Sequence, residues 1–145
     1  MSEKWDRRFL EIADVVASWS KDPSTQSGAV IVRTNLSIAS VGFNGFARGM
    51  SDAPELYADR ETKYSRVIHC EVNALIHATE SLQGYTLYTT PFMCCDRCVV
   101  QMIQAGIKRF VFRAASADAK ERWADAFVKT LGYMDEAGCE WSEYE

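Results

Sequence analysis

The sequence has no long apolar run and little positive charge. No stretch approaches the roughly 20 consecutive apolar residues that cross a bilayer, so we expect no contact with a membrane. The first eight residues are charged and lack the apolar core of a secretion signal, which predicts a cytoplasmic protein. The 16 basic residues are outnumbered by 20 acidic ones, and the net charge is −4. Broad binding to a nucleic-acid backbone needs a positive stripe and is therefore disfavoured.

Histidine is scarce and cysteine is clustered. There are two histidines, His69 and His77, and three of the five cysteines lie within residues 94–98. An odd number of crowded cysteines in a reducing compartment favours metal binding or catalysis over a disulfide framework. Of the 145 residues, 48% are hydrophobic and 25% are charged, which is typical of a globular protein. We therefore expect a single domain over residues 1–145.

Short apolar segments alternate with amphipathic ones. Residues 28–32 form a β-branched run typical of a buried strand, and residues 37–43 alternate as its hairpin partner. Further strands are expected over residues 86–90, 109–113 and 139–144. Helices are expected over residues 4–20, 69–79, 95–105 and 117–131. This order predicts an α/β fold with three layers, α/β/α, around a mixed five-stranded sheet.

The sequence also predicts which faces of two helices are buried and where a long loop lies. The first helix is expected to bury Trp5, Phe9, Ile12, Ala13, Val16 and either Trp19 or Ala17. The helix over residues 117–131 is expected to bury Trp123, Phe127, Val128 and Leu131. Residues 44–64 show no clear period and are expected to form a loop, which is either a surface loop or a segment that closes over a pocket.

Two short motifs carry residues suited to metal chemistry. His69-x-Glu71 and Cys95-x-x-Cys98 each stand at the predicted start of a helix, where the helix dipole and free amides favour a thiolate. A catalytic zinc takes three nitrogen or sulfur ligands and keeps one position open for water. His69, Cys95 and Cys98 supply such a set. Glu71 is then placed to move protons as a general acid–base rather than to bind the metal.

Each half of this pattern has a simpler interpretation. His-x-Glu alone often marks a capped helix start with a buried histidine, and Cys-x-x-Cys alone can be a redox pair or a structural zinc site. A redox pair normally follows a strand in a thioredoxin-like unit. A structural site takes four closed ligands, but no second Cys-x-x-Cys is present, and His77 lies more than two helical turns from His69. The combined pattern favours a catalytic zinc.

A longer series of residues resembles the deoxycytidylate (dCMP) deaminases, which are members of the zinc-dependent cytidine deaminase family. The matching segments are residues 42–46, 48–49, 62–64, 69–74, 95–98 and 103–108. The resemblance covers nearly the whole chain and keeps its order. It implies a cytidine deaminase-like fold, a Zn²⁺ cofactor, hydrolysis of dCMP to dUMP and ammonia, and a homo-oligomer, either a dimer or a hexamer.

The resemblance also implies roles for individual residues. It assigns the zinc ligands and the proton shuttle to His69, Cys95, Cys98 and Glu71. It places Asn44 against the sugar, and the backbone around Cys70 against the pyrimidine. Charge and placement alone suggest Arg48, Lys63 and Tyr64 for the phosphate.

Three features depart from the family pattern, and one of them is an extra residue between Tyr88 and Cys95. Cys70 stands where alanine is usual, and Cys94 stands where proline is usual. Cys94 is thus an alternative ligand with Cys-x-x-x-Cys spacing to Cys98. We prefer Cys95, because Cys-x-x-Cys preserves the helical-turn geometry.

The sequence leaves three rival functions open. The first is a deaminase of a free base, a nucleoside or a modified dCMP, since acidic residues in the expected loop leave phosphate binding unproven. The second is a non-enzymatic zinc-binding module. The third is editing of polynucleotide bases, against which the net charge of −4 counts.

Overall fold

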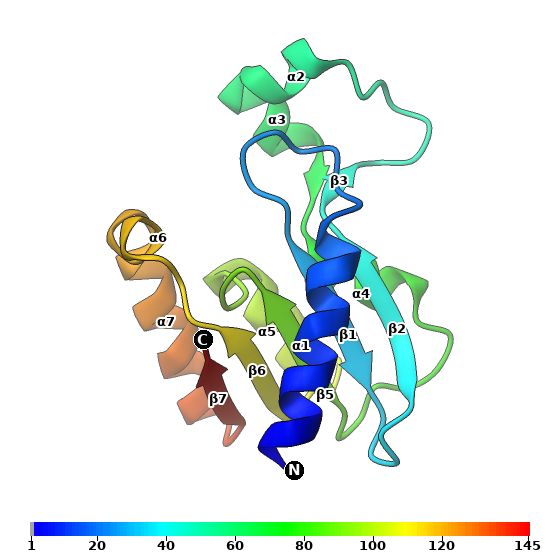
Figure 1. Cartoon of the computed structure of the whole chain (residues 1–145), viewed down its shortest axis with the longest axis vertical. Coiled ribbons are helices and arrows are strands. Elements are labelled where there is room, and N and C mark those ends of the chain that lie inside the picture. Colours follow the sequence, from blue (N-terminus) through cyan, green and yellow to red (C-terminus); the bar gives the residue numbers. More distant parts are fainter. Residues whose placement is uncertain (1) are drawn as a thin grey trace.

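A mixed five-stranded sheet forms the centre of the molecule (Figure 1). The computed structural model describes residues 2–145. The strands, in their order across the sheet, are β2 (Ile38–Phe43), β1 (Gly28–Val32), β5 (Thr86–Thr90), β6 (Arg109–Arg113) and β7 (Glu140–Tyr144). Strand β1 is antiparallel to β2 and β5, whereas β5, β6 and β7 are parallel. The parallel pairs need crossover connections, which helices supply.

Helices cover both faces of this sheet (Figure 1). They are α1 (Glu3–Ala17), α2 (Pro54–Ala58), α3 (Arg60–Arg66), α4 (Cys70–His77), α5 (Asp96–Gln104), α6 (Ala117–Arg122) and α7 (Ala124–Glu136). Helix α1 packs on one face, and α4, α5 and α7 contribute to the core on the other. The predicted α/β/α layers and the mixed sheet are thus confirmed. Within residues 2–145, none of the helices has the combined length and apolar character needed to cross a membrane.

Alternating side chains of the buried strands divide the core in two. Val30 and Val32 of β1 pack with Phe9 and other residues of α1, whereas Ile31 packs with the helices of the opposite face. All five residues of β1 are buried, as the continuous apolar run predicts for a central strand. The sequence pattern therefore reports burial on both faces.

Several predicted boundaries are wrong. Residues 44–64 are not a loop throughout, because they contain α2, most of α3 and the two-residue strand β3 (Gly45–Phe46), which pairs with β4 (Val67–Ile68). Pro54 begins α2, and the Asp59 side chain caps α3 by accepting from the Thr62 N–H. Helices of five and seven residues are too short to produce a clear period in the sequence.

The first and last predicted helices also differ from expectation. Helix α1 ends at Ala17, so Trp19 lies outside it and is 55% exposed. The helix expected over residues 117–131 is two helices that meet at Trp123, and the second continues to Glu136. Helix α7 buries Phe127, Thr130 and Met134, whereas Val128 is 71% exposed and Trp123, at the junction, is 39% exposed.

The close approach of α4 to β2 depends on Gly42. A Cβ atom at this position would lie 2.5 Å from the Cys70 carbonyl oxygen and nearer still to the Ala74 backbone nitrogen. Both obstacles are backbone atoms, which cannot rotate out of the way. Glycine therefore sets the distance at which α4, and the residues at its start, lie against the sheet.

A buried ionic cluster ties α1 to the far strands of the sheet. Asp6 is fully buried and accepts hydrogen bonds from Arg109 (2.6 and 2.8 Å), from the Tyr88 hydroxyl (2.8 Å) and from the Tyr144 hydroxyl (2.8 Å). Burial alone would raise the pKa of Asp6, but the hydrogen bonds from Arg109 and the two tyrosines hold it below its ordinary value. The carboxylate is therefore charged and fully partnered.

We expect Asp6→Asn to lower the free energy of unfolding at pH 7 by about 3–5 kcal/mol, because Arg109 would keep a partly buried charge without its partner. The pKa of Asp6 is lower in the folded chain, so its contribution is complete above the unfolded-state pKa of about 3.9 and is lost as the pH falls through the folded value. The difference between the two proteins should therefore shrink in acid.

Urea unfolding at neutral and acidic pH measures this effect. Glu3→Gln is the control, since its ion pair with Arg7 on the same helix is exposed and should contribute no measurable stability. Equal stabilities of wild type and Asp6→Asn at pH 7 would contradict the assignment.

Candidate active site

Three potential metal ligands converge where α4 and α5 begin. His69 directly precedes α4, Cys95 directly precedes α5, and Cys98 lies in the first turn of α5. The Nδ1 atom of His69 is 3.6 Å from the Cys95 Sγ and 3.2 Å from the Cys98 Sγ. The three ligand atoms all lie within 4.8 Å of one another, and no other group of this kind is found in residues 2–145.

These distances fit a tetrahedral zinc site. Zinc–nitrogen bonds of about 2.0–2.1 Å and zinc–sulfur bonds of about 2.3 Å place ligand atoms roughly 3.5 Å apart. The observed separations from His69 to the two sulfurs are close to this value. One nitrogen and two sulfurs leave a coordination position without a protein ligand, as a catalytic site requires.

Interactions within this group shift the pKa values of the two thiols in opposite directions. Hydrogen bonding with Cys98 lowers the pKa of Cys95 to about 4 despite burial, and His69 acts in the same direction. The same interaction and burial raise the pKa of Cys98. Contact with Cys95 raises the pKa of His69. The group thus favours one thiolate at neutral pH, and a bound cation would favour the second.

Glu71 lies beside the three ligands in the first turn of α4. Its side chain is only 5% exposed, and its Oε1 atom is 3.7 Å from the Nδ1 of His69. Its Oε2 atom accepts a hydrogen bond of 3.0 Å from the Cys70 thiol. The carboxylate is therefore held close to the ligand set without belonging to it.

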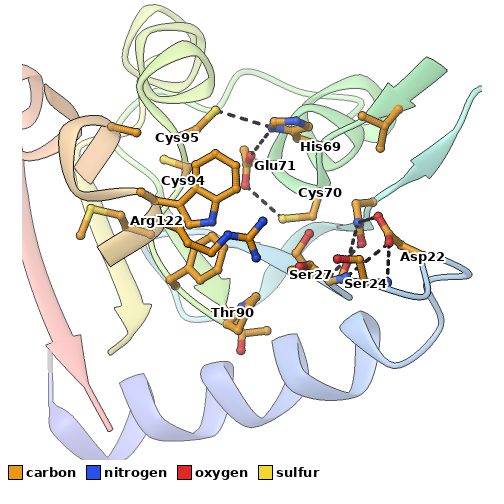
Figure 2. Close-up of a pocket in the computed structure, with 18 of the residues that line it drawn as sticks. Asp22, Ser24, Ser27, His69, Cys70, Glu71, Thr90, Cys94, Cys95 and Arg122 are labelled. Atoms are coloured by element: carbon orange, nitrogen blue, oxygen red, sulfur yellow. Dashed lines mark hydrogen bonds and ion pairs between the residues drawn. The ribbon is translucent and has the colours of Figure 1, made fainter. Parts of the chain in front are cut away.

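A cavity opens in front of Glu71, and its walls come from segments far apart in the sequence. Figure 2 shows His69, Glu71 and Cys95 on one side of it and Asp22, Ser24 and Ser27 on another, with Arg122 pointing inward. The lining residues come from residues 22–27, 44, 63–71, 90–95 and 122–127.

Asn44, predicted to contact a sugar, lies in this wall and is buried. Its side-chain oxygen accepts from the Ser27 N–H at 2.9 Å, and its amide donates to the Thr25 carbonyl at 2.9 Å and to Asp22 at 3.3 Å. Asn44 therefore organises the 22–27 loop at the edge of the cavity.

The other predicted contact residues divide into two groups. Cys70, Lys63 and Tyr64 line the cavity, and Cys70 is fully buried. Arg48 is exposed and is not among the lining residues. The alternative ligand Cys94 is buried in the wall, where burial raises the pKa of its thiol, and it lies outside the three-ligand group.

Sequence reasoning missed Asp22, Arg122 and Trp123 as lining residues. Asp22 belongs to an Asp-Pro-Ser turn interpreted only as a helix end, and Arg122 and Trp123 belong to a helix interpreted as packing. No motif spacing marks them. Only the folded chain brings them to the cavity.

The fold and the site together define a metal-dependent hydrolytic centre of the deaminase class, with a His-Cys-Cys ligand set and an adjacent glutamate. The model for the cytidine and deoxycytidylate deaminase zinc-binding region matches residues 3–114. This chain belongs to the cytidine and deoxycytidylate deaminase family. Its cofactor is zinc, and His69, Cys95 and Cys98 are positioned to bind a metal ion.

Individual relatives agree with this assignment. The chain is 40% identical over 140 residues to a protein of Aliivibrio fischeri called "Uncharacterized deaminase in luxG 3'region", covering 97% of this chain and 93% of that one. It is 38% identical over 117 residues to deoxycytidylate deaminase of Mus musculus, covering 75% of this chain and 64% of that one. The chain thus spans just under two thirds of the mouse enzyme.

Solved structures show the same fold. The dCMP deaminase of cyanophage S-TIM5, in complex with dCMP and dUMP, superposes with a TM-score of 0.76 at 22% identity, covering 99% of this chain and 98% of that one. A guanine deaminase from Nitrosomonas europaea superposes with a TM-score of 0.58 at 14% identity, covering 99% and 76%. The cytidine deaminase-like fold predicted from the sequence is therefore confirmed.

Proposed function

We propose that this chain hydrolyses dCMP to dUMP and ammonia. The observation that carries the proposal is the buried carboxylate of Glu71, which lies 3.7 Å from His69 in a cavity also lined by Cys95. The mouse relative, called deoxycytidylate deaminase, supports dCMP as the substrate. The cyanophage structure with dCMP and dUMP supports a fold that accommodates this nucleotide pair.

His69, Cys95 and Cys98 are proposed to hold the zinc ion, and Glu71 to move the protons. Zinc, when bound, lowers the pKa of a coordinated water from about 15.7 toward 7. Glu71 accepts a proton from the attacking water and delivers it to the ring nitrogen. A carbon–oxygen bond forms at the ring carbon, and Glu71, now deprotonated again, takes the proton of the new hydroxyl group. It passes this second proton to the amine as the carbon–nitrogen bond breaks and a carbonyl group forms. The Cys70 thiol keeps one carboxylate oxygen oriented during these transfers.

Asn44, Cys70, Lys63 and Tyr64 are proposed to contact the substrate, since all four line the cavity. Arg48 does not line the cavity, so the same argument does not extend to it. We further propose that residues 1–145 act as one domain in a cytoplasmic homo-oligomer, a dimer or a hexamer, of the kind the family resemblance implies. The net charge of −4 supports a free nucleotide rather than a polynucleotide as the substrate.

A substrate panel tests the proposal. Ammonia release should be measured with dCMP, deoxycytidine, cytosine and guanine, with zinc content determined on the same preparations. We expect the highest kcat/KM for dCMP and loss of turnover after zinc removal. Equal or better activity on an unphosphorylated substrate would end the assignment of dCMP and favour a nucleoside or base deaminase.

A further inference from the structure

The cavity contains a guanidinium group supplied from outside the region that the family model matches. Arg122 ends α6, whereas the match ends at residue 114. Figure 2 shows its side chain reaching into the cavity toward the side where Ser24 and Ser27 lie. No carboxylate of residues 2–145 lies within ion-pair distance of Arg122. Its guanidinium carbon lies 5.5 Å from the centre of the Trp123 ring, which leaves its N–H donors available.

The other cation of the cavity is already neutralised. The Nζ atom of Lys63 lies 2.9 and 3.0 Å from the two carboxylate oxygens of Asp22. The side chains of Lys63 and Asp22 are only 15% and 2% exposed. Removing one partner from a pair so poorly solvated is costly. Lys63 therefore holds the 22–27 loop, and a substrate contact by Lys63 would add no positive charge that Asp22 does not already balance.

The loop held by this pair presents hydroxyl groups to the same cavity. The Asp22 carboxylate accepts from the N–H groups of Ser24 (2.8 Å) and Thr25 (3.3 Å), which fixes the path of the loop. The Ser24 side chain lines the cavity and is exposed to solvent. A guanidinium and a hydroxyl in the wall of one cavity suit a phosphate, because the planar fork of arginine donates two parallel hydrogen bonds to phosphate oxygens.

We propose that Arg122, assisted by the Ser24 hydroxyl, binds the 5′-phosphate of the substrate and so determines specificity for nucleotides over nucleosides. This inference rests on the proposed deamination of dCMP. With the pyrimidine ring beside Glu71, the phosphate lies toward Arg122 and the 22–27 loop. A nucleoside leaves Arg122 solvated and gains nothing from it, so the contribution of Arg122 is confined to phosphorylated substrates.

The test compares Arg122→Gln with Lys120→Gln. Both variants remove one positive charge from an exposed side chain of α6, but only Arg122 lines the cavity. We expect Arg122→Gln to lower kcat/KM for dCMP by roughly 10- to 100-fold, in line with the loss of charge-assisted hydrogen bonds. The kcat/KM for deoxycytidine should change by less than about threefold, and Lys120→Gln should behave as wild type with both substrates.

Two further measurements separate this inference from the proposed function. Inorganic phosphate should inhibit the wild type competitively and should inhibit Arg122→Gln much less. Calorimetric titration with dCMP should show weaker binding to Arg122→Gln whether or not turnover occurs. Wild type that binds dCMP without releasing ammonia would contradict the proposed function alone. Equal losses for dCMP and deoxycytidine, or no loss for either, would overturn the role of Arg122.

Discussion

Replacement of Glu71 by glutamine should lower kcat for dCMP by about 10²- to 10⁴-fold, while the zinc content of the protein stays at that of the wild type. Glutamine has nearly the same shape and can still accept a hydrogen bond from the Cys70 thiol, but it cannot take up a proton. Because Glu71 lies outside the three-ligand group, metal binding should not depend on its charge.

Steady-state kinetics should be used to measure kcat, and the zinc content should be determined on the same preparation. Glu11→Gln on the exposed side of α1 is the matched control and should retain full activity. Unchanged kcat in Glu71→Gln would reject Glu71 as the proton shuttle. A wild-type protein that binds zinc but deaminates none of the tested substrates would favour a non-enzymatic zinc-binding module.

Zinc binding should depend on Cys95 and not on its neighbour Cys94. We expect Cys95→Ala to lose zinc and activity together, and Cys94→Ala to keep both. Loss of an outer-shell partner typically costs 10- to 100-fold in metal affinity, so loss of a direct ligand should exceed about 100-fold. The physical reason is that the Cys95 sulfur lies 3.6 Å from His69, whereas Cys94 stands outside the group.

Competition with a zinc-selective chelator gives the affinities of both variants. Circular dichroism should accompany it, because Cys94 is buried and its replacement leaves a small cavity. Zinc loss in a folded Cys94→Ala variant, together with zinc retention in Cys95→Ala, would show that Cys-x-x-x-Cys spacing holds the metal.

Much of the fold could be predicted because its strands are short and strongly patterned. The continuous apolar run of β1 marked a central strand, and the expected strand over residues 139–144 is present as β7. The break at Trp123 was not predictable, since residues 117–136 contain no proline and their glycine lies away from the break. At the break, Trp123 leaves the helical region with φ −114° and ψ 18°, and its neighbours in the chain are exposed.

The residues of the candidate site also fall into a group that the sequence predicts and a group that it does not. His69, Glu71, Cys95 and Cys98 could be predicted because their spacing along the chain already matches the geometry that a metal demands. Asp22 and Arg122 could not, because they are 100 residues apart and only the folded chain brings both to one cavity. Their side chains are also common on ordinary surfaces, so neither carries a signal of its own.

The alignment of the Glu71 carboxylate depends on Gly42, which does not line the cavity. Gly42 lies behind α4, and the space left by its missing side chain is what lets this helix, and Glu71 with it, come up against the sheet. An engineer who reshapes the pocket therefore has almost no freedom at residue 42, although this residue lies outside the cavity wall. A methyl group added at residue 42 would push α4 away from the sheet and displace Glu71 with it.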